Sequence, residues 1–316
     1  MTMVATGKIG VALHEFGAIN QIEAIVLAEQ LGVSTAWLTT GGLAPDAMGI
    51  FTAAAARTSQ IGLGTAIVPM FPRHPLVLVQ QTLVVAALAP GRFRLGVGPS
   101  HQPAVENMYG IPFQRPLEYL REYVTILRST LHDGKVAFDG KRLHAHGELT
   151  PPSPPVPVLI SALRPASYRL AGEISDGALA WVSPLPYLRD AALPALRDGA
   201  AKANRQVPPL IAHCFAAVHE DAAAVRETAR NRLAVYARLP FYQEMFARAG
   251  YPEARQGAMS DAMLDAVVVH GDEHAVASRL QQYLSEGMDE LIVSTLVIGD
   301  DRRPSLERTL RLVGTL

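Results

Sequence analysis

Short apolar runs, each followed by a longer segment with helical periodicity, recur along the whole chain. Eight of these runs are rich in β-branched and small apolar residues, and they predict strands over residues 8–13, 35–40, 61–68, 92–97, 157–163, 177–182, 210–218 and 289–297. Several of them, such as LIAHCFAAV at 210–218, are apolar at nearly every position instead of alternating. This pattern is typical of parallel strands that are covered on both faces.

The segments between the predicted strands contain helices whose ends follow from the residue types. Pro116 suits a first helical position, and apolar residues then recur at helical spacing as far as Leu131. A second helix is predicted from an N-cap at Asp272 to a left-handed C-cap at Gly287. Pro75 indicates the first turn of a third helix.

Eight strand–helix units in one chain predict a (β/α)8 TIM barrel that forms a single domain over residues 1–316. A doubly wound sheet is disfavoured because no G-x-G-x-x-G pattern follows the first strand. Two segments interrupt the alternation. Residues 145–157 contain five prolines and are predicted to form a semi-extended surface connector, and residues 238–261 are predicted to form an extra helical excursion between strands seven and eight.

Composition excludes several classes of function. The formal net charge of -1 gives no electrostatic footprint for nucleic acid, and no basic run indicates a membrane surface. The single cysteine, Cys214, excludes an internal disulfide framework and a cysteine-based metal site. With no signal peptide and no apolar run of membrane-spanning length, we expect a soluble cytoplasmic protein.

Familiar hydrolytic and metal-binding patterns are missing as well. There is no G-x-S-x-G elbow and no P-loop, so triad hydrolysis and nucleoside triphosphate chemistry have no support. His132, His144 and His146 fall in polar segments and are predicted to be solvated loop residues, whereas His213 lies in a strand and is predicted to be a satisfied structural histidine. None of these has the spacing or the carboxylate neighbours of a metal site, and we expect none.

Polar residues follow several predicted strands directly, at the end where barrels of this kind bind ligands. His14 follows the first strand, and Pro99, Ser100 and His101 follow the fourth. Two interpretations of His101 remain open from these residues alone: it faces a ligand, or it hydrogen-bonds a loop carbonyl.

The fifth strand runs through Leu163 into Arg164, and Pro165 then opens a helix. The first N–H groups of that helix, at Ala166 and Ser167, have no intrahelical partner, and together with the helix dipole and the arginine charge they favour an anion. An ordinary capped helix is the alternative. The arginine and the serine favour a phosphate site.

Four segments carry a resemblance to a known family: LGTAIVPMFPRHPLVLVQQ (63–81), GRFRLGVGPSHQPAVENMYGIPFQRP (91–116), VLISALRPASYRLAGEISDGALAW (158–181) and GDEHAVASRLQQYLSEGMDELIV (271–293). In this order and spacing the chain resembles the bacterial luciferase-like flavin and deazaflavin oxidoreductases, over nearly its whole length. Within them, the form GVGPSHQP is similar to the branch that depends on coenzyme F420.

The resemblance implies a set of site residues and a cofactor. It places a non-prolyl cis peptide between Ala66 and Ile67, behind the central ring of the cofactor. It assigns Pro99 and Ser100 to the cofactor wall, and its phosphate to Leu163, Arg164, Ala166 and Ser167. It also implies a homodimer, and hydride transfer between C5 of F420 and a small-molecule substrate that the sequence does not identify.

One departure from the family concerns the acid/base groups. F420-dependent sugar-phosphate dehydrogenases have an Asp-His pair after strand two and a glutamate after strand four, whereas this chain has Thr40-Gly41 and His101 there. Sugar-phosphate oxidation is therefore not expected, and His101 or His14 is predicted to act as the catalytic acid or base. Candidate pocket walls are Phe16, Met70, Phe71, Trp181 and residues 238–250.

Two other functions stay open at this point. An FMN-dependent luciferase-like monooxygenase has the same barrel, but FMN lacks the lactyl-oligoglutamate tail of F420, which needs basic or amide groups beyond the phosphate. A non-catalytic barrel protein is the second alternative.

Overall fold

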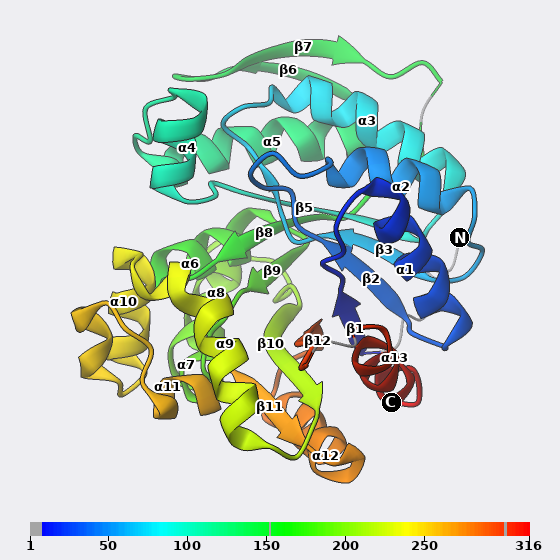
Figure 1. Ribbon diagram of the computed structural model, residues 1–316. Coiled ribbons are helices and arrows are strands. Elements are labelled where there is room, and N and C mark those ends of the chain that lie inside the picture. Colours follow the sequence, from blue (N-terminus) through cyan, green and yellow to red (C-terminus); the bar gives the residue numbers. More distant parts are fainter. Residues whose placement is uncertain (1–7, 152, 300–301) are drawn as a thin grey trace.

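The computed structural model describes residues 8–151, 153–299 and 302–316. The first residues of the chain, on which the expectation of no signal peptide partly depends, and Pro152 in the proline-rich segment lie outside this part. Parallel strands form a closed barrel in the centre, with helices around it (Figure 1). The predicted TIM barrel is confirmed.

Each of the eight predicted runs contains one barrel strand. The barrel strands are β1 (Ile9–Ala12), β2 (Thr35–Leu38), β3 (Gly62–Thr65), β5 (Phe93–Gly98), β8 (Val158–Ala162), β9 (Gly177–Ala180), β10 (Leu210–Val218) and β12 (Glu290–Thr295). They pair in the order β10-β12-β1-β2-β3-β5-β8-β9, and pairing of β9 with β10 closes the ring. In this order β1 lies opposite β8, and β5 lies opposite β12.

Helices follow the strands and cover the outside of the barrel. They are α1 (Ala18–Gln30), α2 (Ala47–Ala55), α3 (Pro75–Leu88), α5 (Pro116–Asp133), α6 (Pro165–Ile174), α8 (Leu193–Lys202), α12 (Glu273–Ser285) and α13 (Arg302–Gly314). The predicted helix ends are confirmed: Pro75 and Pro116 open α3 and α5, and the Asp272 carboxylate caps α12. Gly287, just beyond α12, has the expected positive φ of 100°.

Shorter elements lie between these units. They are β4 (Val68–Pro69), α4 (Gln102–Tyr109), β6 (Lys135–Asp139), β7 (His144–Glu148), α7 (Leu185–Tyr187), η1 (Leu188–Ala192), α9 (Ala222–Ala237), α10 (Pro240–Arg248), η2 (Pro252–Gln256), α11 (Asp261–Asp265) and β11 (Val268–Gly271). The helices α10, η2 and α11 form the predicted excursion between strands seven and eight. It begins earlier than predicted, because α9 belongs to the same connection.

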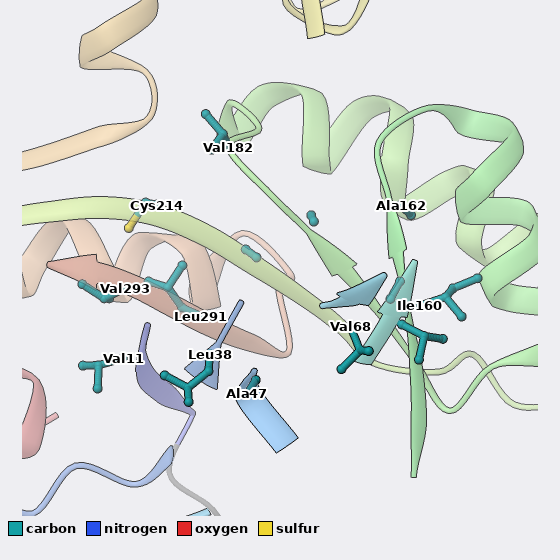
Figure 2. Close-up of a cluster of buried hydrophobic side chains, with 14 of the residues drawn as sticks. Val11, Leu38, Ala47, Val68, Ile160, Ala162, Val182, Cys214, Leu291 and Val293 are labelled. Atoms are coloured by element: carbon teal, nitrogen blue, oxygen red, sulfur yellow. The ribbon is translucent and has the colours of Figure 1, made fainter. Parts of the chain in front are cut away.

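Alternate residues of the strands form two apolar layers. Val11, Leu38, Ile160, Leu291 and Val293 point outward to the helices and belong to the large core that Figure 2 shows. The residues next to them in the chain form a smaller cluster inside the barrel: Ala12, Trp37, Leu159, Leu179, Ile211 and Ile292. Both faces of the strands are thus buried, which is why the sequence shows continuous apolar runs.

The indole of Trp37 fills much of the barrel interior, and glycines on the neighbouring strands make room for it. A Cβ at Gly64 of β3 would overlap the Trp37 ring, and one at Gly10 of β1 would lie 2.9 Å from Trp37 Nε1. Arg94 of β5 covers the same ring, with its guanidinium carbon 4.6 Å from the ring centroid. The interior is therefore a packed plug, and a ligand must bind at an end of the barrel.

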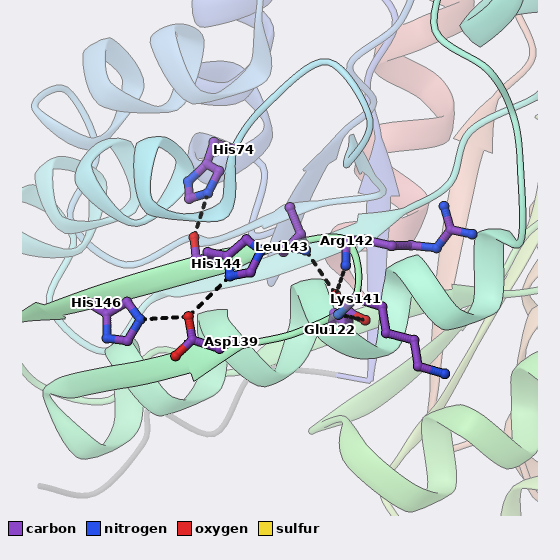
Figure 3. Close-up of polar contacts among 8 residues, drawn as sticks. All are labelled: His74, Glu122, Asp139, Lys141, Arg142, Leu143, His144 and His146. Atoms are coloured by element: carbon purple, nitrogen blue, oxygen red, sulfur yellow. Dashed lines mark hydrogen bonds and ion pairs between the residues drawn. The ribbon is translucent and has the colours of Figure 1, made fainter.

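The prediction of a connector over residues 145–157 was partly wrong. Its first residues belong to β7, which pairs with β6 in an antiparallel hairpin outside the barrel. The Glu122 carboxylate of α5 accepts the N–H groups of Lys141, Arg142 and Leu143, each at 3.0 Å, and so fixes the hairpin turn (Figure 3). A contact with a helix that precedes the hairpin thus stabilises a strand that composition alone did not indicate.

The three histidines predicted to be solvated in loops have different surroundings. His144 and His146 are exposed, but they lie on β7, and both contact the same Asp139 oxygen, at 3.1 and 3.0 Å (Figure 3). His132 is half-buried and not in a loop: it lies in the last turn of α5, 3.3 Å from Asp176, and the hydrogen bond to Asp176 raises its pKa. Within the described ranges, no group of three or more His, Cys, Asp and Glu side chains could hold a metal ion.

Candidate functional site

A pocket of about 580 Å³ opens at the carboxyl ends of the barrel strands. Strand ends form one side of it, and side chains of α9 and α10 form another. All ten predicted site residues line this one pocket: His14, Ala66, Ile67, Pro99, Ser100, His101, Leu163, Arg164, Ala166 and Ser167. Their roles toward a ligand stay predictions.

The strand that was predicted over 61–68 is interrupted at the pocket. β3 ends at Thr65 and β4 begins at Val68, and the peptide bond between Ala66 and Ile67 is cis, as the resemblance implies. Ala66 donates its N–H to Leu38 O at 2.7 Å, and Ile67 O accepts the N–H of Thr40 at 3.0 Å. Ala66 is held by the last residue of β2 and Ile67 by the chain that follows it, so the bulge forms a fixed surface on one side of the pocket.

The end of β5 turns sharply into the pocket. Ser100 has a left-handed backbone with φ of 60°, and His101 occupies the N-cap position of α4. The His101 ring lies edge-on to Tyr236 and Tyr242, with centroids 6.0 and 5.9 Å away, and burial lowers its pKa. Its ring makes no hydrogen bond to a loop carbonyl in the described ranges, so the second interpretation of His101 finds no support.

The start of α6, where an anion site is predicted, leaves a backbone N–H and a guanidinium without hydrogen-bond partners in the described chain. Ala166 is the second residue of the helix, so no carbonyl within the helix lies four residues before its N–H. Arg164 is exposed, its guanidinium lies 4.1 Å from the centroid of the Phe241 ring, and it forms no ion pair with a carboxylate of the described chain.

The Ser167 hydroxyl, which was predicted to contact a phosphate, hydrogen-bonds the backbone of its own chain. It accepts the N–H groups of Leu163 and Arg164, at 3.0 and 3.1 Å, and donates to Arg164 O at 2.8 Å. These three bonds use the capacity of the hydroxyl. Ser167 therefore shapes the start of the helix, and the groups free for an anion are the Arg164 side chain and the Ala166 N–H.

His14 approaches from the opposite side of the rim, at the end of β1. Its Nε2 lies 3.3 Å from the Ser294 hydroxyl. Burial, and secondarily the positive charge of Arg232, lower its pKa to about 4. His14 is therefore neutral at pH 7.

Trp181 forms an aromatic wall of the pocket, as predicted. It stacks on His213 with centroids 3.6 Å apart, and its Nε1–H donates to the Tyr236 hydroxyl at 2.9 Å. The prediction of three other residues as pocket walls was wrong. Phe16 is 81% exposed, Met70 is fully buried, and Phe71 packs against Phe113 and Tyr119, so none of the three lines the pocket.

Sequence reasoning missed the contribution of α9. Arg232, Val235 and Tyr236 of this helix line the pocket beside Phe241 and Tyr242 of α10. The spacing of Arg232 and Tyr236 was an available signal, because residues four apart lie on one face of a helix. The local sequence did not indicate that this face of α9 lies toward the barrel.

Comparisons with known proteins agree with this geometry. A family model described as luciferase-like monooxygenase matches residues 1–290. The chain is 29% identical over 298 residues to an F420-dependent glucose-6-phosphate dehydrogenase of Nakamurella multipartita, covering 88% of this chain and 87% of that protein. It is 27% identical over 310 residues to a 5,10-methylenetetrahydromethanopterin reductase of Methanolobus tindarius, covering 91% and 92%.

Among solved structures, the fold matches the coenzyme F420-dependent tetrahydromethanopterin reductase of Methanopyrus kandleri. The TM-score is 0.78, the identity is 22%, and the match covers 98% of each chain. At that identity the likeness concerns the fold alone.

Proposed function

The chain belongs to the luciferase-like monooxygenase family, and we propose that it is an F420-dependent oxidoreductase that exchanges a hydride between the deazaflavin C5 and a small organic substrate. When bound, the deazaflavin supplies or accepts the hydride, so the protein's part is to bind, orient and shield the reactants. The choice of F420 rests on the glucose-6-phosphate dehydrogenase relative, which is named for that cofactor.

The observation that carries the proposal is the convergence of an anion site and a fixed bulge in one pocket. Arg164 and the N–H of Ala166 would hold the cofactor phosphate, because Arg164 forms no ion pair in the described chain and the Ala166 N–H has no partner within the helix. The helix dipole also favours an anion at this end. Ala66 and Ile67, held by backbone hydrogen bonds, would support the ring. The walls are mostly apolar, which suits a planar ring system and excludes water from the reacting atoms.

His101 is the residue we propose to exchange a proton with the substrate. Its ring lines the pocket and is neutral at pH 7 because burial lowers its pKa. A neutral imidazole without a protein hydrogen bond can accept a proton from a substrate hydroxyl at a ring nitrogen. Tyr236 and Tyr242 hold the ring edge-on and restrict its orientation.

The chain departs from sugar-phosphate dehydrogenation at two positions of the rim. Thr40-Gly41 and His101 stand where the F420-dependent sugar-phosphate enzymes have an Asp-His pair and a glutamate. We therefore propose a substrate other than a sugar phosphate, although four of the matched relatives are named for glucose 6-phosphate.

An FMN-dependent monooxygenase is the second candidate, and the description of the matching family model favours it. Titration of the purified protein with F420 and with FMN, followed by fluorescence quenching, separates the two. We expect tighter binding of F420. Tighter binding of FMN would overturn the choice of cofactor, and binding of neither would support a non-catalytic barrel.

The anion site is tested by Arg164→Ala. Loss of a hydrogen bond to a charged group costs roughly 1.5–3 kcal/mol, so F420 should bind about 10- to 100-fold more weakly. Arg169→Ala is the matched control, because Arg169 lies on the same helix but contacts Asp198, at 3.6 Å, and does not line the pocket. Equal affinities of the two variants would contradict the assignment of Arg164.

A further inference from the structure

Two side chains on strands and one that follows β1 form a hydrogen-bonded chain that leads to the pocket. His213 Nε2 of β10 lies 2.8 Å from Ser294 Oγ of β12, and Ser294 Oγ lies 3.3 Å from His14 Nε2. The other nitrogen of His213, Nδ1, lies 3.2 Å from the backbone N of Val182. His213 and Ser294 are fully buried, whereas His14 lines the pocket.

The backbone fixes the tautomer of His213. The Val182 N–H can only donate, so His213 Nδ1 must present a lone pair. A charged imidazole would carry protons on both nitrogens and could not accept this bond. His213 is therefore neutral with its proton on Nε2, and it donates that proton to the Ser294 oxygen.

The hydrogen bond from His213 determines that the Ser294 hydroxyl donates its proton to His14. Its oxygen already accepts from His213, and its own proton needs an acceptor. Among the described groups the acceptor is His14 Nε2, since a bond in the other direction would leave the serine proton without a partner. His14 Nε2 is then a lone pair, and a neutral His14 carries its proton on Nδ1.

The surroundings of His14 favour the neutral form. Burial disfavours a charged imidazole, and the positive charge of Arg232 on α9 opposes it further, so the pKa of His14 is lowered. The His213 ring on β10, which also lies close, is neutral and adds no compensating negative charge. His14 Nδ1 makes no hydrogen bond with any group of the described chain. The protonated nitrogen is thus available to a molecule in the pocket.

We propose that His14 is a neutral hydrogen-bond donor of the pocket, and that Ser294 and His213 are positioning residues that keep its proton on Nδ1. The inference rests on the proposed function in that a bound cofactor or substrate must supply the acceptor. His14 then donates to an oxygen or nitrogen that gains negative charge as hydride moves, and it does not act as a base, because Nε2 is occupied.

The position of His14 in the barrel limits which part of a bound molecule can accept its hydrogen bond. β1 lies opposite β8 in the ring, so His14 faces the part of the bound molecule that is remote from the phosphate site at Arg164. A carbonyl oxygen at the reacting end of the substrate, or a ring carbonyl of the cofactor, has the required chemistry.

Long-range ¹H–¹⁵N NMR of histidine-labelled protein tests the tautomers directly, without any ligand. At pH 7 we expect His213 with a protonated Nε2 and His14 with a protonated Nδ1, each assigned by loss of its signals in a His→Gln variant. A wild-type His14 that is protonated on Nε2, or on both nitrogens, would overturn the proposal.

Ser294→Ala separates positioning from packing. Without the hydroxyl, we expect the His14 proton to move to Nε2, whereas Ser294→Thr, which keeps a hydroxyl, should retain it on Nδ1. Ser175→Ala is the matched control, because Ser175 is equally buried but hydrogen-bonds only the backbone oxygens of Ala171 and Gly177. An unchanged His14 spectrum in a folded Ser294→Ala protein would also overturn the proposal.

A second arm adds saturating F420 to the wild-type protein. A shift of the His14 Nδ1–H resonance assigns the acceptor to the cofactor, and an unshifted resonance in the bound protein assigns it to the substrate. Because the first arm contains no ligand, its result stands even where F420 fails to bind, so failure of the proposed function and failure of this inference are distinguishable.

Discussion

Three histidines, His14, His101 and His213, lie at or beneath one pocket, and burial lowers the pKa of each. At the scale of single residues, their hydrogen-bond partners decide which ring nitrogens remain free to contact a ligand. His213 has both nitrogens occupied, His14 has one nitrogen free, and the His101 ring contacts tyrosines with no hydrogen bond to the described chain. Two of the three can therefore face a ligand.

His14, which is half-buried at the pocket, makes stability depend on pH. Its pKa falls from 6.5 in the unfolded chain to about 4 in the folded one, so between these values the unfolded chain binds a proton that the folded chain does not. The free energy of unfolding therefore decreases as pH falls through this window. In urea denaturation at pH 7 and pH 5, the loss for the wild type should exceed that for His14→Gln by roughly 1–2 kcal/mol.

His274→Gln is the control for this measurement, since His274 is exposed on α12 and does not line the pocket. It should lose as much stability between the two pH values as the wild type. A His14→Gln protein with the wild-type dependence on pH would contradict the assignment.

At the scale of elements, the barrel contributes to the pocket through the carboxyl-terminal halves of its strands and the residues that follow them. Further down, the inward-facing residues pack against one another around Trp37, with glycines on the flanking strands. The connection from β10 to β12 then adds α9 and α10, whose side chains complete the wall above the rim. The strands thus position the residues that are predicted to bind the cofactor, and α9 and α10 complete the pocket wall.

The packing around Trp37 predicts that Gly64→Ala destabilises the protein. The added methyl would overlap the indole, and overpacking of a filled core costs about 1–3 kcal/mol. Gly49→Ala is a matched control within α2, because a Cβ there meets no atom within 4 Å, and it should raise stability by about 0.5–1 kcal/mol. Thermal unfolding of both variants measures the difference, and equal melting temperatures would contradict the packing argument.

At the scale of the whole molecule, a polar contact spans the barrel. Arg94 of β5 reaches Glu290 of β12, on the opposite side of the ring, with Nη1 2.7 and 2.8 Å from the two carboxylate oxygens. Both side chains are mostly buried, and the Arg94 guanidinium also covers Trp37.

In the part of the chain that the structure describes, no helix has the length and apolar character to cross a membrane. Association as a homodimer stays a prediction.

The contact across the barrel predicts a large effect of Arg94→Ala. Removal of one partner leaves the Glu290 carboxylate buried and unpaired, which costs about 3–5 kcal/mol. The exposed pair Arg57–Glu23 gives the control, because solvent screens this pair and Arg57→Ala should have little effect on stability. Denaturant unfolding at pH 7 compares the two, and a small loss in Arg94→Ala would show that water reaches Glu290.

The sequence by itself determined the barrel, the positions of its strands and the residues at the rim. These features follow from local patterns: apolar runs mark the strands, prolines and caps mark the helices, and the residues after each strand reach the carboxyl end of a parallel barrel. For the same reason Arg164 and His101 could be selected before the structure was known.

Only the tertiary structure decided which partner each of these residues has. His14 and Ser294 are 280 residues apart in the chain, the hairpin turn depends on Glu122 of a preceding helix, and Arg232 reaches the pocket because α9 folds over it. The tautomers follow from hydrogen bonds between β1, β10 and β12. Such contacts depend on how distant segments pack, and no local pattern contains that information.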